Sequence, residues 1–275
     1  MRDLRIGIIG AGRLGTALAV HLSRRDRRIA GIFDIETSKA KNLARIIPTG
    51  TADSLAEIPR RADILFLTVP DSEIARVSET LGELENYRAR FIFHFSGILP
   101  ARILHLAGMD KAVYSLHPFG GIPPNAISKN PFENLYFSGE GDTPAKPIAL
   151  EIAKTLDGKF VEIPSSKKVA YHLSASLVAN HMFALLSAGE RLLKQTGLPK
   201  TDIEAMINEL ARTALENYGK QGLRGGLTGP AVRKDELTIA EHLIEADRHN
   251  LLELYSAGLA ELRRLIRGAD NDIID

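Results

Sequence analysis

The fold is decided by residues 5–19, which read Arg-Ile-Gly-Ile-Ile-Gly-Ala-Gly-Arg-Leu-Gly-Thr-Ala-Leu-Ala. A short apolar run leads into Gly-x-Gly-x-x-Gly at positions 10–15, and a helical pattern follows at once. Such a turn is typical of dinucleotide binding, because its glycines permit a tight turn, a close approach of pyrophosphate to the backbone, and close helix packing. The free N–H groups at the start of the helix favour the phosphates. The predicted cofactor-binding residues of this turn are Gly10, Gly12, Arg13, Leu14 and Gly15.

The composition is that of an ordinary globular protein, and it excludes several classes of function. The 275 residues are 44% hydrophobic and 25% charged, and this length suits one large or two medium domains. A net charge of +1 gives no field that would attract nucleic acid or an anionic membrane. The absence of cysteine excludes disulfides, thiolate metal sites and a cysteine nucleophile. The first strand begins too near Met1 to leave room for a signal peptide, so we expect a cytoplasmic protein.

Strand and helix patterns alternate through the first part of the chain, as they do in parallel α/β sheets. The predicted strands are residues 6–9, 28–34, 46–50, 63–69, 90–95, 112–116, 134–138 and 159–163. After Pro164 no convincing strand pattern follows, and the main helices are predicted at residues 165–196, 201–218, 236–246 and 248–266. We therefore predict an α/β Rossmann-type dinucleotide-binding domain at residues 1–164. An all-α domain for substrate binding and dimerisation is predicted at residues 165–275.

One predicted helix is apolar enough to raise the question of a membrane span. Residues 169–189 contain no Asp, Glu, Lys or Arg, and a segment of that length could cross a bilayer. The segment nevertheless carries polar side chains, so a buried helix in a soluble protein is the better interpretation, and we expect no membrane partner. Because the helix is more apolar than one small domain can bury, we also expect a homodimer through the helical domain.

Asp34 stands at the end of the second predicted strand, where an acid can hydrogen-bond both ribose hydroxyls of NAD. A 2′-phosphate at that point would meet negative charge, and Glu36 would add to it, with Lys39 as the nearest cation. The sequence therefore favours NAD as cofactor, with NADP as the alternative. Asp34 could instead be a helix-capping residue.

Ligands of open α/β sheets bind beyond the carboxyl ends of the strands. Val69, Pro70 and Ser96 follow two such strands, so we expect them to border the nicotinamide, although Ser96 could be only a turn residue. His117 follows another strand, where its imidazole could orient or protonate a substrate oxygen. A structural histidine bonded to a loop carbonyl fits this position equally well.

The long helix carries Lys168, His172, Ser176 and Asn180 at intervals of four residues, so these form one polar stripe among apolar neighbours. Buried polar groups need partners, because each unpaired group costs about 1–3 kcal/mol. A substrate carboxylate and carbonyl would supply them, and so would interhelical hydrogen bonds or a dimer interface.

A second polar segment, Thr-Gly-Pro-Ala-Val-Arg at residues 228–233, follows a glycine-rich break. Arg233 could hold a carboxylate through a bidentate pair, or it could be a solvated loop residue. The histidines lack metal-site spacing, so no metal is predicted. The chain also lacks Gly-x-Ser-x-Gly, which makes a serine hydrolase a poor interpretation.

Together these motifs resemble a known family. The first half resembles the superfamily that contains pyrroline-5-carboxylate reductases, 3-hydroxyisobutyrate dehydrogenases and ketopantoate reductases. More narrowly, the chain resembles a Rossmann-like oxidoreductase group whose helical C-terminal domain has long been labelled as of unknown function. The segments that carry this resemblance are Val69-Pro-Asp71, His94-Phe-Ser-Gly97, Ser115-Leu-His-Pro118, Tyr171-His172 with Asn180, and Leu227-Thr-Gly-Pro-Ala-Val-Arg233 followed by His242.

The resemblance implies a substrate class. Some members of the group resemble an alternative type of ketopantoate reductase, which makes 2-dehydropantoate the lead substrate. In the wider superfamily a lysine and asparagines on the corresponding helix handle the substrate carbonyl and carboxylate. Lys168 and Asn180 match in kind, but His172 stands where asparagine is usual, so the proton donor is either Lys168 or His172. The loop after His117 is similar to that of prephenate dehydrogenases, in which the histidine engages the substrate hydroxyl.

We therefore expect an NAD(P)-dependent oxidoreductase that transfers a hydride between nicotinamide and a carbonyl or imine of a small carboxylate. Lys168 or His172 would donate the proton, with His117 on the nicotinamide side. The residues expected to hold the substrate are Ser176, Asn180, Thr228 and Arg233. Alternatives are a prephenate- or pyrroline-5-carboxylate-type enzyme, a non-catalytic protein that senses NAD(H) or a metabolite, and a purely structural role.

Overall fold

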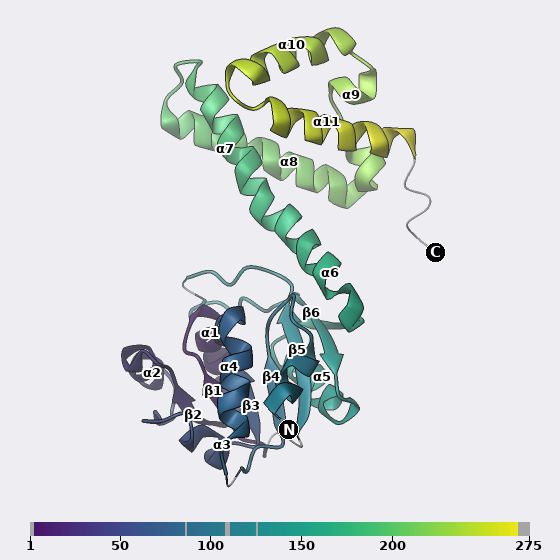
Figure 1. Ribbon diagram of the computed structural model, residues 1–275. Coiled ribbons are helices and arrows are strands. Elements are labelled where there is room, and N and C mark those ends of the chain that lie inside the picture. Colours follow the sequence, from purple (N-terminus) through teal and green to yellow (C-terminus); the bar gives the residue numbers. More distant parts are fainter. Residues whose placement is uncertain (1–2, 86, 108–110, 125, 269–275) are drawn as a thin grey trace. The chain divides into compact units, whose positions relative to one another are not determined.

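The computed structural model describes residues 3–85, 87–107, 111–124 and 126–268. The chain divides into two compact units, Met1–Ala179 and Asn180–Asp275, hereafter unit 1 and unit 2 (Figure 1). The sequence places the change of pattern earlier, at residue 164. The first turns of the long helix nevertheless belong to unit 1, because Lys168 and Tyr171 bond to residues of the sheet.

The core of unit 1 is a β-sheet. In the described residues it has seven strands, in the order β2-β1-β3-β4-β5-β6-β7. The strands are β1 Ile6–Ile9, β2 Ile29–Phe33, β3 Ile64–Leu67, β4 Phe91–His94, β5 Ala112–Pro118, β6 Tyr136–Gly141 and β7 Lys159–Glu162. Neighbours pair in parallel except β5 and β6. Because β1 lies between β2 and β3, the chain adds β2 on one side of β1 and the later strands on the other side. Open α/β sheets bind ligands at such a point, where the strand order changes direction. The predicted Rossmann-type fold is confirmed.

Both faces of this sheet are covered, which explains why its strands are continuously apolar. In β3, Ile64 and Phe66 belong to one hydrophobic cluster, whereas Leu65 and Leu67 belong to the other. The first cluster includes residues of α1, α2 and α5, and the second includes residues of α3 and α4. These helices are α1 Arg13–Ser23, α2 Thr37–Ala44, α3 Glu57–Arg61, α4 Asp71–Gly82 and α5 Lys146–Thr155. Short 3₁₀ segments are η1 Ala101–Ala107, η2 Thr143–Ala145 and η3 Ser165–Lys167.

The strand predicted at residues 46–50 is wrong. Residues 45–48 form turns, and the nearest pairing is an isolated bridge between Ile32 and Thr51. Pro48 explains the difference, because proline cannot donate a hydrogen bond to a neighbouring strand. The other predicted strands are present, with ends that differ by a few residues.

The long helical segment runs from Ser165 to Lys194, as α6 Lys168–Ala175, a π-helical turn η4 Ser176–Asn180, and α7 His181–Lys194. Its mean hydropathy of 1.3 over an 18-residue window and its length would suffice to cross a membrane, a property that core helices of soluble proteins share. No residue of that window is buried within the described part of the chain. The predicted burial is therefore wrong for the single chain, which leaves side chains such as Leu177 and Phe183 exposed.

Unit 2 is helical throughout its described residues. Its helices are α7, α8 Lys200–Gly226, α9 Pro230–Arg233, α10 Glu236–Arg248 and α11 Leu252–Arg267. Helix α8 extends further than predicted, through the glycine-rich stretch, with a kink at Gly222, whose φ of 70° suits glycine. Asp235 caps α10 by accepting a hydrogen bond from the backbone N–H of Thr238 at 3.1 Å.

Gly15 provides a test of the packing between α1 and the sheet. A Cβ at this position would overlap the carbonyl oxygen of Gly10 and would lie 2.6 Å from Oγ1 of Thr68. We expect Gly15→Ala to lower the free energy of unfolding by about 1–3 kcal/mol in urea titrations, as overpacked cores do. Gly12→Ala is the matched control, since a Cβ there meets no described atom within 4 Å. Equal stability of the two variants would contradict this packing.

Candidate functional site

The glycine turn between β1 and α1 is fixed by contacts with β2 and β3. Gly10 has a φ of 104°, its N–H donates to the Phe33 carbonyl at 2.8 Å, and its carbonyl accepts from Thr68 Oγ1 at 2.6 Å. A Cβ on Gly10 would lie 2.7 Å from the Thr68 carbonyl, so both conformation and space require glycine. Gly12 precedes the first helical residue and has open space beside it. The turn therefore leaves open space beside Gly12 at the start of α1, where a phosphate could approach the N-terminus of the helix.

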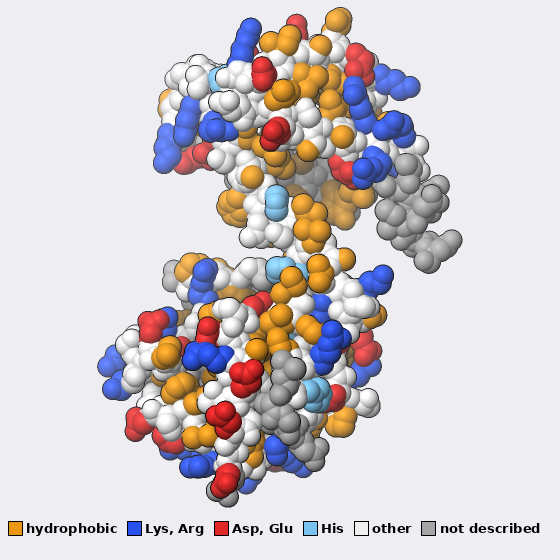
Figure 2. All heavy atoms as spheres, in the orientation of Figure 1, with side chains coloured by type: hydrophobic (Ala, Val, Ile, Leu, Met, Phe, Trp, Pro, Cys, Tyr) orange, Lys and Arg blue, Asp and Glu red, His pale blue; other side chains and the backbone are white. Residues whose placement is uncertain are grey.

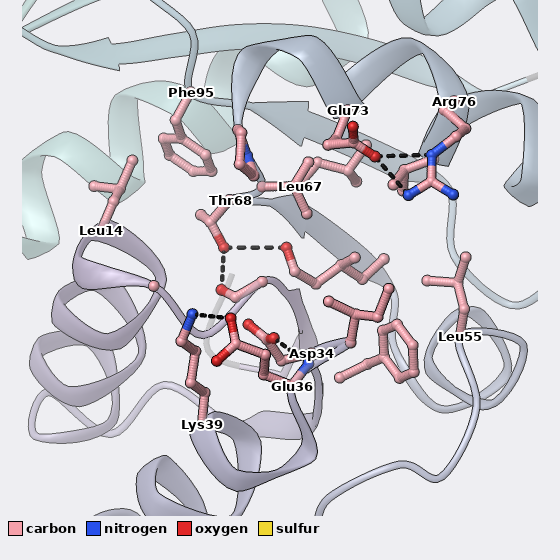
Figure 3. A pocket seen from close by; sticks show the side chains of 18 of the residues that line it. Leu14, Asp34, Glu36, Lys39, Leu55, Leu67, Thr68, Glu73, Arg76 and Phe95 are labelled. Atoms are coloured by element: carbon pink, nitrogen blue, oxygen red, sulfur yellow. Dashed lines mark hydrogen bonds and ion pairs between the residues drawn. The ribbon is translucent and has the colours of Figure 1, made fainter.

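A cavity of about 720 Å³ lies beside this turn at the carboxyl ends of β1, β2 and β3. Figure 3 shows its lining, with Asp34, Glu36 and Lys39 clustered together, and Leu14 and Phe95 among the apolar residues. Of the predicted cofactor-binding residues, those that line it are Gly10, Gly12, Leu14, Asp34, Val69 and Pro70. Arg13, Gly15 and Ser96 are described residues outside the lining. Gly15 lies close to Gly10 and Thr68, in the helix-packing role that the motif gives its third glycine.

Asp34 lines the cavity with a charged side chain, and the same side chain holds the glycine turn by hydrogen bonds. One carboxylate oxygen accepts from the Ala11 N–H at 2.6 Å, and the other accepts from the Glu36 N–H at 2.8 Å. The Asp34 side chain thus holds the glycine turn against the end of β2. Lys39 is paired with Glu36 at 2.5 Å, and this hydrogen bond raises the pKa of the lysine. The end of the cavity next to β2 therefore keeps net negative charge.

Ser96 has a structural role that differs from the one predicted. Its Oγ donates to Asp71 Oδ2 at 2.6 Å and accepts from the N–H groups of Ile98 at 3.2 Å and Leu99 at 3.0 Å. These bonds use the hydroxyl proton and both lone pairs. The Ser96 side chain is therefore engaged in the turn after β4, which corresponds to the alternative of a turn residue.

Lys168 is buried against that same turn, with 2% of its surface exposed. Its Nζ donates to the Ser96 carbonyl at 3.1 Å and to Ser115 Oγ at 2.7 Å. Burial lowers the pKa of Lys168 to about 8, against the opposing charges of Glu140 and Asp71. The lysine thus ties α6 to the ends of β4 and β5, and two of its N–H groups are already in use.

The imidazole rings of His117 and His172 pack against Gly97, and the phenol of Tyr171 contacts His117. The rings of His117 and His172 have centroids 6.2 Å apart, and Tyr171 Oη lies 2.9 Å from His117 Nδ1. A Cβ on Gly97 would lie 2.6 Å from His172 Cδ2 and 2.9 Å from His117 Nε2, so the glycine makes room for both rings. Burial, together with the nearby charges of Lys168 and His172, lowers the pKa of His117 to about 3. His117 is therefore neutral at physiological pH.

His94 is a member of this group that the sequence reasoning did not assign a role. It is the last residue of β4 and fully buried, and its Nδ1 accepts from the Ser96 N–H at 3.2 Å. Burial, with the charge of Lys168, lowers the pKa of His94 to about 3. Its position in the His94–Gly97 segment was the available signal. Because Nδ1 accepts from the Ser96 N–H, the neutral His94 ring carries its proton on Nε2.

The polar stripe of the long helix does not form one buried row. Lys168 and His172 face the Ser96–Gly97 turn, Ser176 is half-buried in the π-helical turn, and Asn180 is exposed. The π-helical turn interrupts the regular helical spacing on which the predicted stripe depends. Asn180 belongs to unit 2.

Unit 2 has a cavity of its own, of about 510 Å³, between α7, α9, α10 and α11. Thr228 lines it together with His242 and Tyr255, whose Nδ1 and Oη lie 3.0 Å apart, and most of the other lining residues are apolar. Arg233 ends α9 and is exposed, which agrees with the alternative of a solvated loop residue. Within the described residues, no cluster of three His, Asp or Glu side chains could hold a metal ion.

Comparisons with known proteins agree with this architecture. Residues 1–118 match a family model described as a Rossmann-like domain, and residues 135–261 match one described as a domain of unknown function, DUF2520. The curated proteins include no match. Among solved structures, a Bacteroides fragilis protein provisionally described as an NADP oxidoreductase is 25% identical, with a TM-score of 0.76 over 96% of this chain and 99% of its own.

Two further structures extend this likeness. A Thermotoga maritima protein is 26% identical, with a TM-score of 0.75 over 96% of this chain and 99% of its own. A pyrroline-5-carboxylate reductase from Streptococcus pyogenes is 15% identical, with a TM-score of 0.68 over 98% of this chain and all of its own. The latter likeness is one of fold. The chain therefore combines a Rossmann-like domain with a helical C-terminal region, as these structures do.

The burial of Lys168 predicts a pH dependence of stability. Its pKa is about 8 in the folded chain and 10.5 when unperturbed, so between these values the unfolded chain binds more protons and stability rises with pH. Urea titrations should show that the free energy of unfolding of the wild type, relative to Lys168→Met, increases from pH 8 to pH 10.5 and is level below pH 7. The same substitution at the exposed Lys167 is the matched control. A pH-independent difference would contradict the assignment.

Proposed function

We propose that this protein is a nicotinamide-dependent oxidoreductase that acts on a carbonyl or imine carbon of a small carboxylate. The observation that carries the proposal is the continuity between the cavity and the imidazole group. Asp71 and Phe95 line the cavity, while Ser96, which follows Phe95 and bonds to Asp71, forms the turn beside His117 and His172. A dinucleotide seated along the glycine turn would therefore end near groups able to donate a hydrogen bond or a proton.

The contacts of each side chain support separate proposed roles for the two histidines and for Lys168. In the reductive direction the cofactor supplies a hydride to the substrate carbon, and a proton from the protein or solvent goes to the oxygen or nitrogen. His117 and His172 lie at the turn with ring atoms close to Gly97, which makes them the proposed groups at the reacting oxygen. Lys168 contributes positive charge from beneath the turn, and its bonds to Ser96 and Ser115 favour a supporting role.

The identity of the dinucleotide rests on two opposed observations. Asp34 and the Glu36–Lys39 pair leave net negative charge at the ribose end, which favours NAD over a 2′-phosphorylated cofactor. The Bacteroides fragilis structure is described as an NADP oxidoreductase, which favours NADP. Our proposal is therefore a nicotinamide dinucleotide, and a titration with both reduced forms distinguishes them.

The substrate class is an oxo or imino carboxylate. The structural likeness to a pyrroline-5-carboxylate reductase supports an imine as a candidate. The resemblance in sequence motifs suggests 2-dehydropantoate, which the comparisons do not support, and the loop after His117 suggests prephenate. These three compounds form the test panel, prephenate with the oxidised cofactor.

Fluorescence titration with NADH and NADPH should show saturable binding of one or both. Gly12→Ala should weaken it about tenfold or more, because a Cβ would stand where a phosphate approaches, while stability is unchanged. Nicotinamide absorbance should then report turnover with one member of the panel.

Binding without turnover of any panel member would favour the alternative of a protein that senses a nicotinamide nucleotide or a metabolite. Failure to bind either nucleotide would contradict both proposals and leave a structural role. If Lys168→Ala and His172→Ala both left turnover intact, the assignment of the Gly97 group as the reacting site would be wrong.

We also propose a cytoplasmic homodimer through the helical region. Hydrophobic side chains remain exposed along the long helix (Figure 2) and on α8, among them Phe183 at 72% and Leu210 at 70% exposure. Exposed apolar surface of this extent is typical of an interaction surface.

Light scattering at micromolar concentration should therefore give twice the chain mass of 30.0 kDa. Phe183→Lys should shift this mass toward the monomer, since a buried ammonium in an apolar interface is costly. Leu237→Lys, at an 84% exposed position on α10, is the matched control. A wild-type monomer would contradict the dimer.

A further inference from the structure

The contact between His117 and Tyr171 has a chemical consequence beyond holding two rings together. Tyr171 Oη lies 2.9 Å from Nδ1 of His117, and the rings meet edge to face at 87°, with centroids 5.6 Å apart. The two residues are far apart in sequence, one at the end of β5 and one on α6. The bond occupies one imidazole nitrogen and leaves only Nε2 for any other partner.

The direction of this hydrogen bond follows from acid and base strength. A phenol, with an ordinary pKa of about 10, is a far stronger acid than a neutral imidazole N–H, and an imidazole nitrogen is a far stronger base than a phenol oxygen. The favoured arrangement is therefore O–H···N, with the Tyr171 hydroxyl donating to Nδ1. Because burial raises the pKa of Tyr171 and lowers that of His117, both groups stay neutral in the physiological range. The single proton of the imidazole then resides on Nε2.

The tyrosine is held in place by groups other than the histidine. Ser138 is paired with His117 in the β5–β6 register, and its hydroxyl also hydrogen-bonds the Tyr171 oxygen. The Phe119 ring packs on Tyr171 with centroids 4.8 Å apart. With a ring contact on one side and a hydroxyl on the other, the phenol is preorganised to donate toward Nδ1.

The Nε2 atom of His117 packs against the backbone at Gly97. It lies 2.9 Å from where a Cβ on Gly97 would stand, and the ring of His172 borders the same glycine. We propose that Tyr171 is a positioning residue that locks His117 in the Nε2–H tautomer, so that His117 acts as a neutral hydrogen-bond donor to the substrate oxygen. The tautomer is a property of the chain itself, whereas the role toward substrate rests on the proposed function.

The groups around His117 are consistent with a neutral donor. Lys168 and His172 approach from α6 and His94 from β4, and the positive charge of Lys168 opposes protonation of the imidazole. Neutral imidazoles are known to polarise carbonyl groups in other enzymes. Such a donor stabilises the developing oxyanion without itself needing to change charge, and His172 remains available to supply the proton.

The tautomer is tested by nitrogen NMR of the full-length, ¹⁵N-labelled protein. The imidazole signals of the eight histidines are compared with those of a His117→Gln variant to assign His117. We expect the wild type to show a protonated Nε2 and an unprotonated Nδ1. Tyr171→Phe, which keeps the ring but removes the hydroxyl, should give mixed tautomers. Tyr136→Phe on β6, with a 48% exposed ring, is the matched control and should leave the signal unchanged.

A kinetic measurement tests the role of the same tautomer. Tyr171→Phe should lower kcat about tenfold, the loss expected for one well-placed hydrogen bond, with the cofactor Kd unchanged. Because His117 stays neutral, it should contribute no ionisation to the pH profile of the wild type. The profiles of Tyr171→Phe and Ser138→Ala should therefore lack no ionisation that the wild-type profile contains. A protonated Nδ1 in the wild type, or an unchanged His117 signal in Tyr171→Phe, would overturn the inference. Absence of any turnover, with the expected NMR result, would overturn only the proposed function.

Discussion

A buried ammonium group is the contact on which the site depends. Nζ of Lys168 binds the Ser96 carbonyl and the Ser115 hydroxyl, and so joins the first turn of α6 to the ends of β4 and β5. Ser96 in turn bonds to Asp71, which lines the nucleotide-sized cavity. Burying a charge is costly unless it is paired and hydrogen-bonded, and here two bonds and two nearby carboxylates offset only part of that cost, since the pKa of Lys168 remains lowered. The lysine therefore fixes the cavity wall and the imidazole group together.

Glycine governs the approach of other groups at two strand ends. At the end of β1, Gly10 lets Thr68 come close enough to bond the turn, and at the end of β4, Gly97 lets two imidazole rings pack on the turn. A methyl group would collide at either place. The first glycine shapes the surface where phosphates would bind, and the second sets the positions of the two imidazoles that are proposed to act on the substrate oxygen. In the proposed function, the turn after β1 binds the cofactor phosphates, and the turn after β4 holds the imidazoles that act on the substrate.

Much of the fold could be predicted, because it follows from local patterns. Continuous apolar runs predicted the strands, and the glycine turn with its following helix predicted the Rossmann-type start of the sheet. The strand predicted at residues 46–50 failed because Pro48 removes a donor, and the end of α8 was missed because the helix continues through Gly222 with a kink. Asp34, Val69 and Pro70 line the cavity, since the carboxyl ends of parallel strands meet at one edge of the sheet, and their role toward a cofactor stays a prediction. The bond from the Ser96 hydroxyl to Asp71 could not be predicted, because its acceptor lies 25 positions earlier in the chain.

The sequence by itself determined the class of fold and the position of the glycine turn, since both depend on neighbours within a few residues. Only the tertiary structure decided what each polar side chain does. Helical spacing made Lys168, His172, Ser176 and Asn180 equivalent members of one stripe, but the lysine turns into the sheet and the asparagine is exposed. The bond between His117 and Tyr171 joins residues 54 positions apart, and no periodicity encodes it. The physical reason is that these hydrogen-bond partners are distant in sequence and meet only where the strand ends pack together in the tertiary structure.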